Sequence, residues 1–103
     1  LKKTEIYLID AISKDHSQMA YERLSTLYLK NNNFLQAKKV LEQGIKYFPK
    51  DQKLYLYLAY SEYNLNNRNR ALILAQKAYE LLPSVESQYI LDQITNNQKI
   101  IFQ

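Results

Sequence analysis

Apolar side chains recur at helical spacing along almost the whole chain, in stretches separated by short polar segments. Leucine, isoleucine, tyrosine and alanine residues return every three or four positions, which is the spacing of the buried face of an amphipathic helix. The 103 residues include only one Gly and two Pro, so few positions favour the tight turns that a β-sheet needs. We therefore predict an all-α protein with about six helices, near residues 3–14, 18–30, 34–47, 52–64, 68–82 and 86–99.

The polar segments between these helices contain residues that end or start helices. The Asn-rich segments 31–33 and 64–67 are predicted turns, because Asn tolerates a left-handed backbone and bonds to nearby backbone groups. Pro49 and Pro83 cannot continue a helix, and each restricts the residue before it. Three residues with short polar side chains are good N-cap candidates for the helices that follow them, namely Ser17, Asp51 and Ser84.

The pattern repeats itself after 34 residues. Segments 18–51 and 52–85 share seven identical positions, which in the first segment are Gln18, Tyr21, Leu24, Asn32, Asn33, Ala37 and Pro49. Small residues also recur where size should matter, as in the pairs Ser25/Ala59 and Gly44/Ala78. Small side chains at such positions let two helices approach closely, so we predict two helix hairpins of similar structure.

At these offsets the chain resembles the tetratricopeptide repeat (TPR) family, whose pattern is a large residue followed by Leu-Gly, Tyr, Ala, Phe, Ala and Pro. The matching residues of the first unit are Tyr21, Leu24, Ser25, Tyr28, Ala37, Leu41, Gly44 and Pro49. Those of the second unit are Tyr55, Leu58, Ala59, Glu62, Ala71, Ala75, Ala78 and Pro83. The second unit departs from the family pattern at Glu62 and Ala75. The resemblance implies a right-handed superhelical solenoid of antiparallel helix hairpins.

On this resemblance, residues 1–103 form one TPR-like domain. Residues 1–17 are an N-terminal helix, interpreted as half of a preceding repeat; 18–51 and 52–85 are the two repeats, and 86–103 are a C-terminal capping helix. The apolar run Ile100–Phe102 does not fit the wettable outer face of a cap. It either folds back onto the core, continues into a further segment, or makes an intermolecular contact.

Little in the sequence indicates catalysis or a cofactor. His16 is the only histidine, and because the chain has no Cys it has no partner at metal-ligand spacing. A single Gly excludes a Gly-rich phosphate loop, and carboxylates such as Glu5 and Asp10 stand alone rather than in acid–base pairs. We therefore expect no enzymatic activity, no metal site and no cofactor.

Charge is spread along the chain rather than gathered into a stripe. The 14 basic and 10 acidic residues give a net charge of +4, and only Arg68 and Arg70 form a dense basic pair. Several of the ten Tyr residues fall at positions of the repeat, so we do not expect a base-stacking surface or nucleic-acid binding. No apolar run approaches the about 18 residues of a membrane span. A start without Met fits a fragment of a longer protein, and the compartment, cytoplasmic or periplasmic, stays open.

In TPR-like superhelices the first helix of each hairpin lines a concave groove. The partner-binding candidates that the resemblance places there are Arg23, Thr26, Lys30, Lys53, Leu56, Tyr60, Tyr63 and Asn64, with Ser87, Ile90 and Leu91 from the last helix. Some TPR domains hold a peptide carboxylate with Lys and Asn at set positions of this groove. Those positions here are Glu22, Thr26, Leu56 and Tyr60, so that clamp is absent.

Three of these candidates, Leu56, Tyr60 and Tyr63, lie at i, i+4 and i+7 on one face of one predicted helix. One hypothesis is that Tyr60 and Tyr63 anchor an extended or helical peptide, since Tyr supplies contact area and a hydroxyl. The alternative is that this face packs under a neighbouring repeat or the C-terminal helix. Replacing both tyrosines with Ala would abolish partner capture without loss of helical structure in the first case, and would impair folding in the second.

These features favour a protein–protein interaction scaffold or adaptor that binds a peptide or protein segment in a Tyr-rich concave groove. The alternative is an accessory or substrate-positioning domain of a larger enzyme, or of a secretion or envelope-assembly protein. A third interpretation is weak self-association through the terminal helices, with Ile100–Phe102 as the contact.

Overall fold

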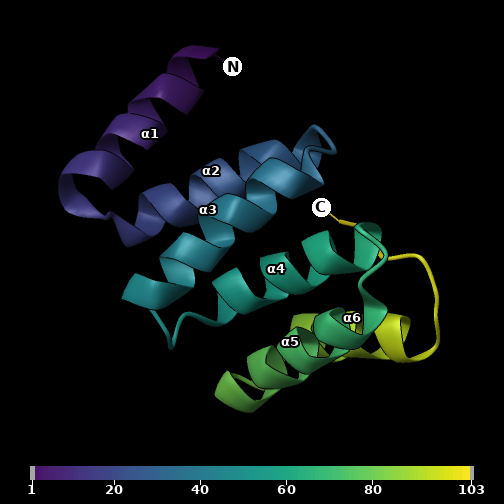
Figure 1. Ribbon diagram of the computed structural model, residues 1–103. Helices are drawn as coiled ribbons and strands as arrows, with labels where there is room; N and C mark the ends of the chain where they lie inside the picture. Colours follow the sequence, from purple (N-terminus) through teal and green to yellow (C-terminus); the bar gives the residue numbers. More distant parts are fainter. Residues whose placement is uncertain (1, 103) are drawn as a thin grey trace.

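The computed structural model describes residues 2–102, which form six α-helices and no β-strand (Figure 1). The helices are α1 (Lys2–Asp15), α2 (Gln18–Lys30), α3 (Phe34–Tyr47), α4 (Gln52–Asn64), α5 (Arg68–Leu81) and α6 (Val85–Thr95). The prediction of an all-α fold with six helices is confirmed for this part of the chain. Among the helices described, none is long and apolar enough to cross a membrane.

The predicted helix bounds agree with the structure except at the end of α6. The first five helices begin and end at or next to the predicted residues. The prediction of helix as far as residue 99 is wrong, because α6 ends at Thr95. Asn97 has a φ of 56°, a left-handed backbone through which an α-helix does not continue. The side chain of Arg68 caps this end, donating from Nε to Ile94 O (3.1 Å) and from Nη2 to Thr95 O (2.9 Å).

The predicted helix starts and turns are confirmed. Ser17 Oγ accepts from Ala20 N at 3.2 Å, which satisfies one of the free N–H groups in the first turn of α2. Asp51 caps α4 and Ser84 caps α6 in the same way. The two Asn-rich turns each contain an Asn with a left-handed backbone, Asn32 at φ 58° and Asn66 at φ 67°.

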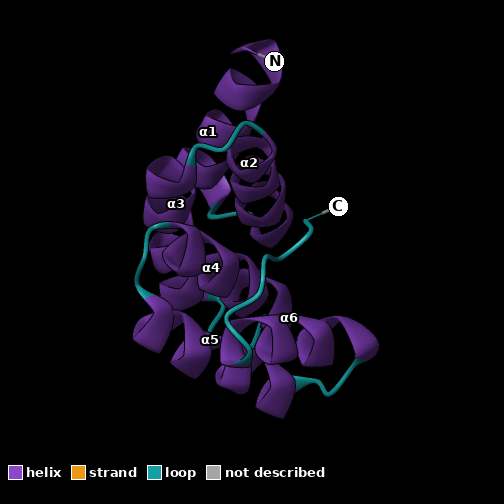
Figure 2. Ribbon diagram, turned by 90° about the vertical axis from the view of Figure 1, so that its right-hand side faces the viewer, coloured by secondary structure: helices purple, strands orange, loops and turns teal. Residues whose placement is uncertain are grey.

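Each helix packs against the next one along the chain, and α2–α3 and α4–α5 run as antiparallel pairs (Figure 1). Further contacts join α2 to α4 and α4 to α6. The molecule measures 39 × 25 × 21 Å, and Figure 2 shows α2, α4 and α6 in succession, with α3 and α5 to one side of them. The row of α2, α4 and α6 positions the candidate site.

Small residues lie buried between packed helices. Ala37 and Ala71 are fully buried at the same position of the two pairs. Gly44 faces the fully buried ring of Tyr21, and a Cβ there would lie 3.1 Å from Tyr21 Cγ and 3.2 Å from Leu54 Cδ1. The prediction that small side chains permit these approaches is therefore consistent with the packing.

The second unit's departure from the repeat pattern, Glu62, is a buried ionic centre. Its side chain has no exposed surface, and Oε1 accepts from Asn67 Nδ2 at 2.8 Å and lies 3.4 Å from Lys38 Nζ. Oε2 lies 2.6 Å from Arg70 Nε but off the N–H direction, so this contact is an ion pair rather than a directed hydrogen bond. The carboxylate thus links α3, α4 and α5.

Residues 96–102, here called the C-terminal segment, leave α6 in a turn and run back toward α4 and α2 (Figure 2). Ile100 is only 4% exposed and belongs to the hydrophobic core. Gln93 Nε2 supports the bend by donating to Lys99 O at 2.7 Å. Of the three alternatives for Ile100–Phe102, the structure has the fold-back onto the core.

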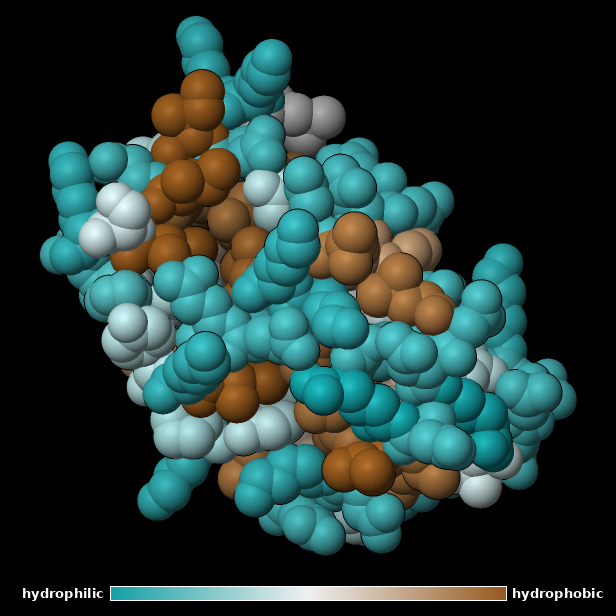
Figure 3. All heavy atoms as spheres, in the orientation of Figure 1, coloured by the Kyte–Doolittle hydropathy of each residue, from teal (hydrophilic) through white to brown (hydrophobic). Residues whose placement is uncertain are grey.

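Helix α1 is packed on one side only. Leu8 and Ile12 are buried, whereas Ile6 and Ile9 on the same helix are 64% and 47% exposed. In the view of Figure 3, apolar side chains are grouped on the surface at the α1 end of the molecule. Tyr28 OH of α2 donates to Glu5 Oε2 at 2.7 Å, which fixes α1 to α2.

Candidate functional site

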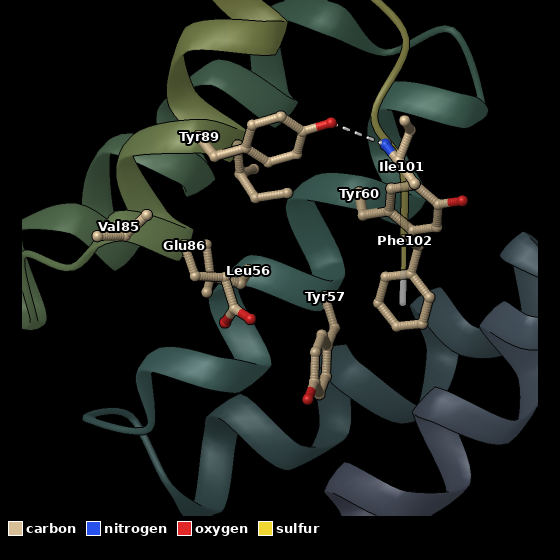
Figure 4. A pocket seen from close by; sticks show the side chains of 9 residues that line it. Leu56, Tyr57, Tyr60, Val85, Glu86, Tyr89, Ile101 and Phe102 are labelled. Atoms are coloured by element: carbon tan, nitrogen blue, oxygen red, sulfur yellow. Dashed lines mark hydrogen bonds between the residues drawn. The ribbon is translucent and has the colours of Figure 1, made fainter.

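Two hollows lie along the row of α2, α4 and α6, and together we call them the groove. The apolar hollow, between α4 and α6, has a volume of about 600 Å³ and is lined by Leu56, Tyr57, Tyr60, Val85, Glu86, Tyr89, Ile90, Ile101 and Phe102 (Figure 4). The basic hollow, bordered by α1, α2 and α4, has about 580 Å³ and is lined by Thr4, Tyr7, Leu8, Met19, Glu22, Arg23, Thr26, Leu27, Lys30, Lys53 and Tyr57. Tyr57 lines both, so the two hollows adjoin.

The C-terminal segment forms one wall of the apolar hollow through aromatic contacts. The Phe102 ring stacks on Tyr60, with 4.8 Å between centroids and 19° between planes. It also meets Tyr57 edge-on at 5.8 Å. Tyr60 also packs against Phe34, with 5.7 Å between ring centroids, and is only 8% exposed. The C-terminal segment therefore covers part of the tyrosine-bearing surface of α4.

Tyrosine hydroxyls in the same region bind the backbone of the C-terminal segment. Tyr63 OH donates to Gln98 O at 2.8 Å. On the α6 side, Ile101 N donates to Tyr89 OH at 3.1 Å, as the dashed line in Figure 4 marks. The backbone of the segment is therefore hydrogen-bonded to α4 through a carbonyl and to α6 through an N–H.

The partner-binding residues expected on α2 and at the start of α4 are brought together. Arg23, Thr26, Lys30 and Lys53 all line the basic hollow. The three cations are exposed, and among residues 2–102 none of them forms an ion pair. The hydroxyl of Thr26 already has a hydrogen bond within α2, because Oγ1 donates to Glu22 O at 2.8 Å.

Of the four candidates farther along α4, two line the apolar hollow and two line neither hollow. Leu56 and Tyr60 line the apolar hollow but are buried, at 3% and 8% exposure. Tyr63 and Asn64 line neither hollow, and Asn64 Nδ2 donates to Tyr60 O at 2.9 Å within the helix. Tyr63 contacts the C-terminal segment, because its hydroxyl donates to Gln98 O.

On α6 the lining residues are mostly not those expected from the repeat. Ile90 lines the apolar hollow as expected, whereas Ser87 is fully buried and belongs to the N-terminal capping box. Val85, Glu86 and Tyr89 line it instead. α6 begins one residue earlier than a strict 34-residue spacing from α4 would place it. The signal in the sequence was the position of Ser84, an N-cap that directly precedes the exposed Val85.

A carboxyl pair sets the charge at the edge of the basic hollow. The hydrogen bond with Asp51, together with burial and the charge of Asp51, raises the pKa of Glu22 to about 7. Burial acts to raise the pKa of Asp51, but hydrogen bonds from Glu22, Gln18 and the backbone hold it below its ordinary value. Gln18 Nε2 donates to Asp51 Oδ2 at 3.0 Å. Glu22 is thus partly protonated near neutral pH, which leaves the hollow more positive.

Burial raises the pKa of both Tyr57 and Tyr60. Both phenols therefore stay protonated at neutral pH. A protonated phenol both donates and accepts a hydrogen bond, and it brings no charge into the apolar hollow. The chemistry available on this wall is hydrogen bonding and aromatic contact.

Groups considered for catalysis or nucleic acid have structural contacts. The His16 ring stacks on Tyr47 with centroids 3.8 Å apart, and Nδ1 lies 3.0 Å from Tyr21 OH. Arg68 caps α6, and Arg70 pairs with Glu62 and with Glu42. Within the described part of the chain, no cluster of three His, Cys, Asp or Glu side chains has the arrangement to hold a metal ion.

Searches against protein families and against curated proteins find no match to this chain.

Proposed function

We propose that this chain is a non-enzymatic protein-interaction module of TPR-like solenoid architecture, whose groove binds a segment of a partner protein. The observation that carries the proposal is the apolar hollow of about 600 Å³ between α4 and α6. A concave, largely apolar hollow with a few polar groups is typical of a site that takes side chains of a ligand. Two apolar residues that line it, Val85 and Ile101, are 89% and 66% exposed, and exposed apolar side chains gathered at one place are characteristic of interaction sites.

The composition of the groove also supports protein recognition. Three tyrosines, Tyr57, Tyr60 and Tyr89, line the apolar hollow. Tyr is enriched at binding hot spots because it offers a large contact area together with a hydroxyl. The TPR-like architecture is supported by the 34-residue repeat and by the buried small residues at its matched positions, such as Ala37 and Ala71.

The test is a selection of displayed peptides on the full chain, followed by affinity measurements on two matched variants. Val85→Asp puts a charge at the rim of the apolar hollow, where the start of α6 tolerates an acid. Ile73→Asp is the control, since Ile73 is 69% exposed on α5 and lines neither hollow. We expect selected peptides to lose about tenfold or more in affinity for Val85→Asp, and to bind Ile73→Asp like the wild type. Failure to select any peptide, or equal effects of the two variants, would refute the proposal.

A further inference from the structure

We infer that the partner segment bound in the groove is acidic, with Asp or Glu side chains over the basic hollow and a neighbouring apolar side chain in the apolar hollow. The inference rests on the function proposed above and names the chemical class of partner for the same site. Its basis is the charge of the side chains that line the two hollows.

The basic hollow presents three positive charges that the protein itself does not neutralise. Arg23, Lys30 and Lys53 are exposed, and within residues 2–102 none of them forms an ion pair. Arg23 and Lys30 are seven positions apart on α2, about two helical turns, so they project from the same face of the helix. Lys53 joins them from the first turn of α4. Such cations can pair with several carboxylates at once, and an Arg guanidinium can hold one carboxylate through two hydrogen bonds.

The acidic groups nearby oppose this charge only in part. Glu22 is the carboxyl group that lines the basic hollow. Its hydrogen bond with Asp51 raises its pKa to about 7, so its charge is partly removed at neutral pH. In the apolar hollow the charged side chain is that of Glu86, which is exposed on α6. The groove is therefore positive beside α2 and negative at α6, and an acidic stretch is attracted to the first side and repelled from the second.

The lining of the basic hollow favours a protein segment over a nucleic acid or a membrane surface. A protein that binds duplex DNA strongly makes about six to ten phosphate contacts, and anionic membranes attract clusters of about four to eight basic residues. Three cations beside a carboxyl group supply fewer contacts, and apolar Leu8, Met19 and Leu27 line the same hollow. Three cations match the few carboxylates of a short peptide, and the adjoining apolar hollow can take its apolar side chain.

The test selects peptides from a random displayed library on the full chain and on two variants, each of which lacks three positive charges. The groove variant carries Arg23→Gln, Lys30→Gln and Lys53→Gln. The control variant replaces three exposed lysines of α3 and α5 that line neither hollow, and it carries Lys39→Gln, Lys46→Gln and Lys77→Gln. Gln is a good helix former, and circular dichroism verifies that the helices are intact. We expect Asp and Glu to be enriched in peptides selected on the wild type and on the control variant, and not on the groove variant.

Affinities measured by fluorescence anisotropy give the size of the effect. A selected acidic peptide should bind the groove variant about tenfold more weakly than the wild type, and should bind the control variant like the wild type. Its affinity for the wild type should also fall as the salt concentration rises from about 50 to 200 mM, because salt screens exposed charges. The same peptide with Asn and Gln in place of Asp and Glu should bind the wild type and the groove variant equally.

The outcomes separate the inference from the proposed function. Peptides that depend on Val85 but show no acidic enrichment, and bind the groove variant like the wild type, overturn the inference and leave the proposed function in place. Failure to select any peptide refutes both. A single-stranded DNA oligonucleotide and phosphatidylserine vesicles are the probes of phosphate binding. If either binds the wild type and the control variant more tightly than the selected peptides do, and does not bind the groove variant, the cations bind phosphate groups and the inference is overturned.

Discussion

The buried carboxylate of Glu62 offers the sharpest test of how the helices are held together. Glu62→Gln keeps an oxygen that can accept from Asn67 Nδ2, but it removes the charge that faces Arg70 and Lys38. If the amide nitrogen takes the place of Oε2, it faces Arg70 Nε, which lies 2.6 Å from that oxygen. Two donors then meet in a site with no exposed surface on the Glu62 side.

The size of the stability loss depends on how well Arg70 and Lys38 are hydrated once the Glu62 charge is removed. Breaking a buried ion pair by removing one member costs about 3–5 kcal/mol when the other charge stays buried. The side chains of Arg70 and Lys38 are 51% and 27% exposed, so both can be partly hydrated after the change. We therefore expect Glu62→Gln to lower the free energy of unfolding by about 2–3 kcal/mol.

Glu42→Gln is the matched control, because Glu42 pairs with the same Arg70 at 3.1 Å but is 39% exposed. Exposed pairs contribute about 0–1 kcal/mol, so this variant should differ little from the wild type. Urea unfolding followed by far-UV circular dichroism at neutral pH measures both values. If Glu62→Gln costs no more than Glu42→Gln, the buried carboxylate does not stabilise the junction of α3, α4 and α5.

Two further predictions concern Glu22 at the edge of the basic hollow and Gly44, which packs against Tyr21. Because Asp51 raises the folded-state pKa of Glu22 from 4.5 to about 7, the stability linked to this carboxyl is complete below about pH 4.5 and is lost as the pH rises through about 7. Glu22→Gln should therefore remove a stability decrease of about 1 kcal/mol over that range, allowing for solvent screening, and thermal unfolding at several pH values measures it. A Cβ at Gly44 would lie 3.1 Å from the buried ring of Tyr21, so Gly44→Leu should cost about 3 kcal/mol or more through overpacking. The same measurement would contradict this reasoning if the melting temperature did not fall.

Many of the helix starts and ends can be predicted from local features of a single sequence. Residues that cap or end helices act within a few positions, so Ser17, Asp51 and the two Asn-rich turns could be predicted without knowledge of packing. The 34-residue spacing further indicates which small residues lie at helix contacts, because a small residue that recurs at the same position of both units is expected to have the same neighbours in each. The end of α6 is not evident from the sequence. Asn32 and Asn66 are 34 residues apart, whereas no Asn lies 34 residues before Asn97.

The site was less predictable because it depends on contacts between distant parts of the chain. The expected α2 residues and Lys53 do meet in one hollow, since positions on neighbouring parallel helices follow from the repeat. The course of the C-terminal segment follows no repeat, and it decides which tyrosines are covered. Glu62 likewise reads as an irregularity until Lys38 and Arg70 are found beside it.

Replacing Tyr60 and Tyr63 together with Ala does not separate binding from folding, because the two side chains have different roles. Tyr60 is 8% exposed and packs against both Phe34 and Phe102, so Tyr60→Ala leaves a cavity and should cost about 3 kcal/mol. Tyr63→Phe removes only the hydroxyl that bonds to Gln98 O, which should cost about 1 kcal/mol or less. Urea unfolding of the single variants distinguishes them, and similar losses would show that the Tyr60 ring is not part of the core. If the losses differ as expected, Tyr63→Phe is the variant that loosens the segment while preserving the fold.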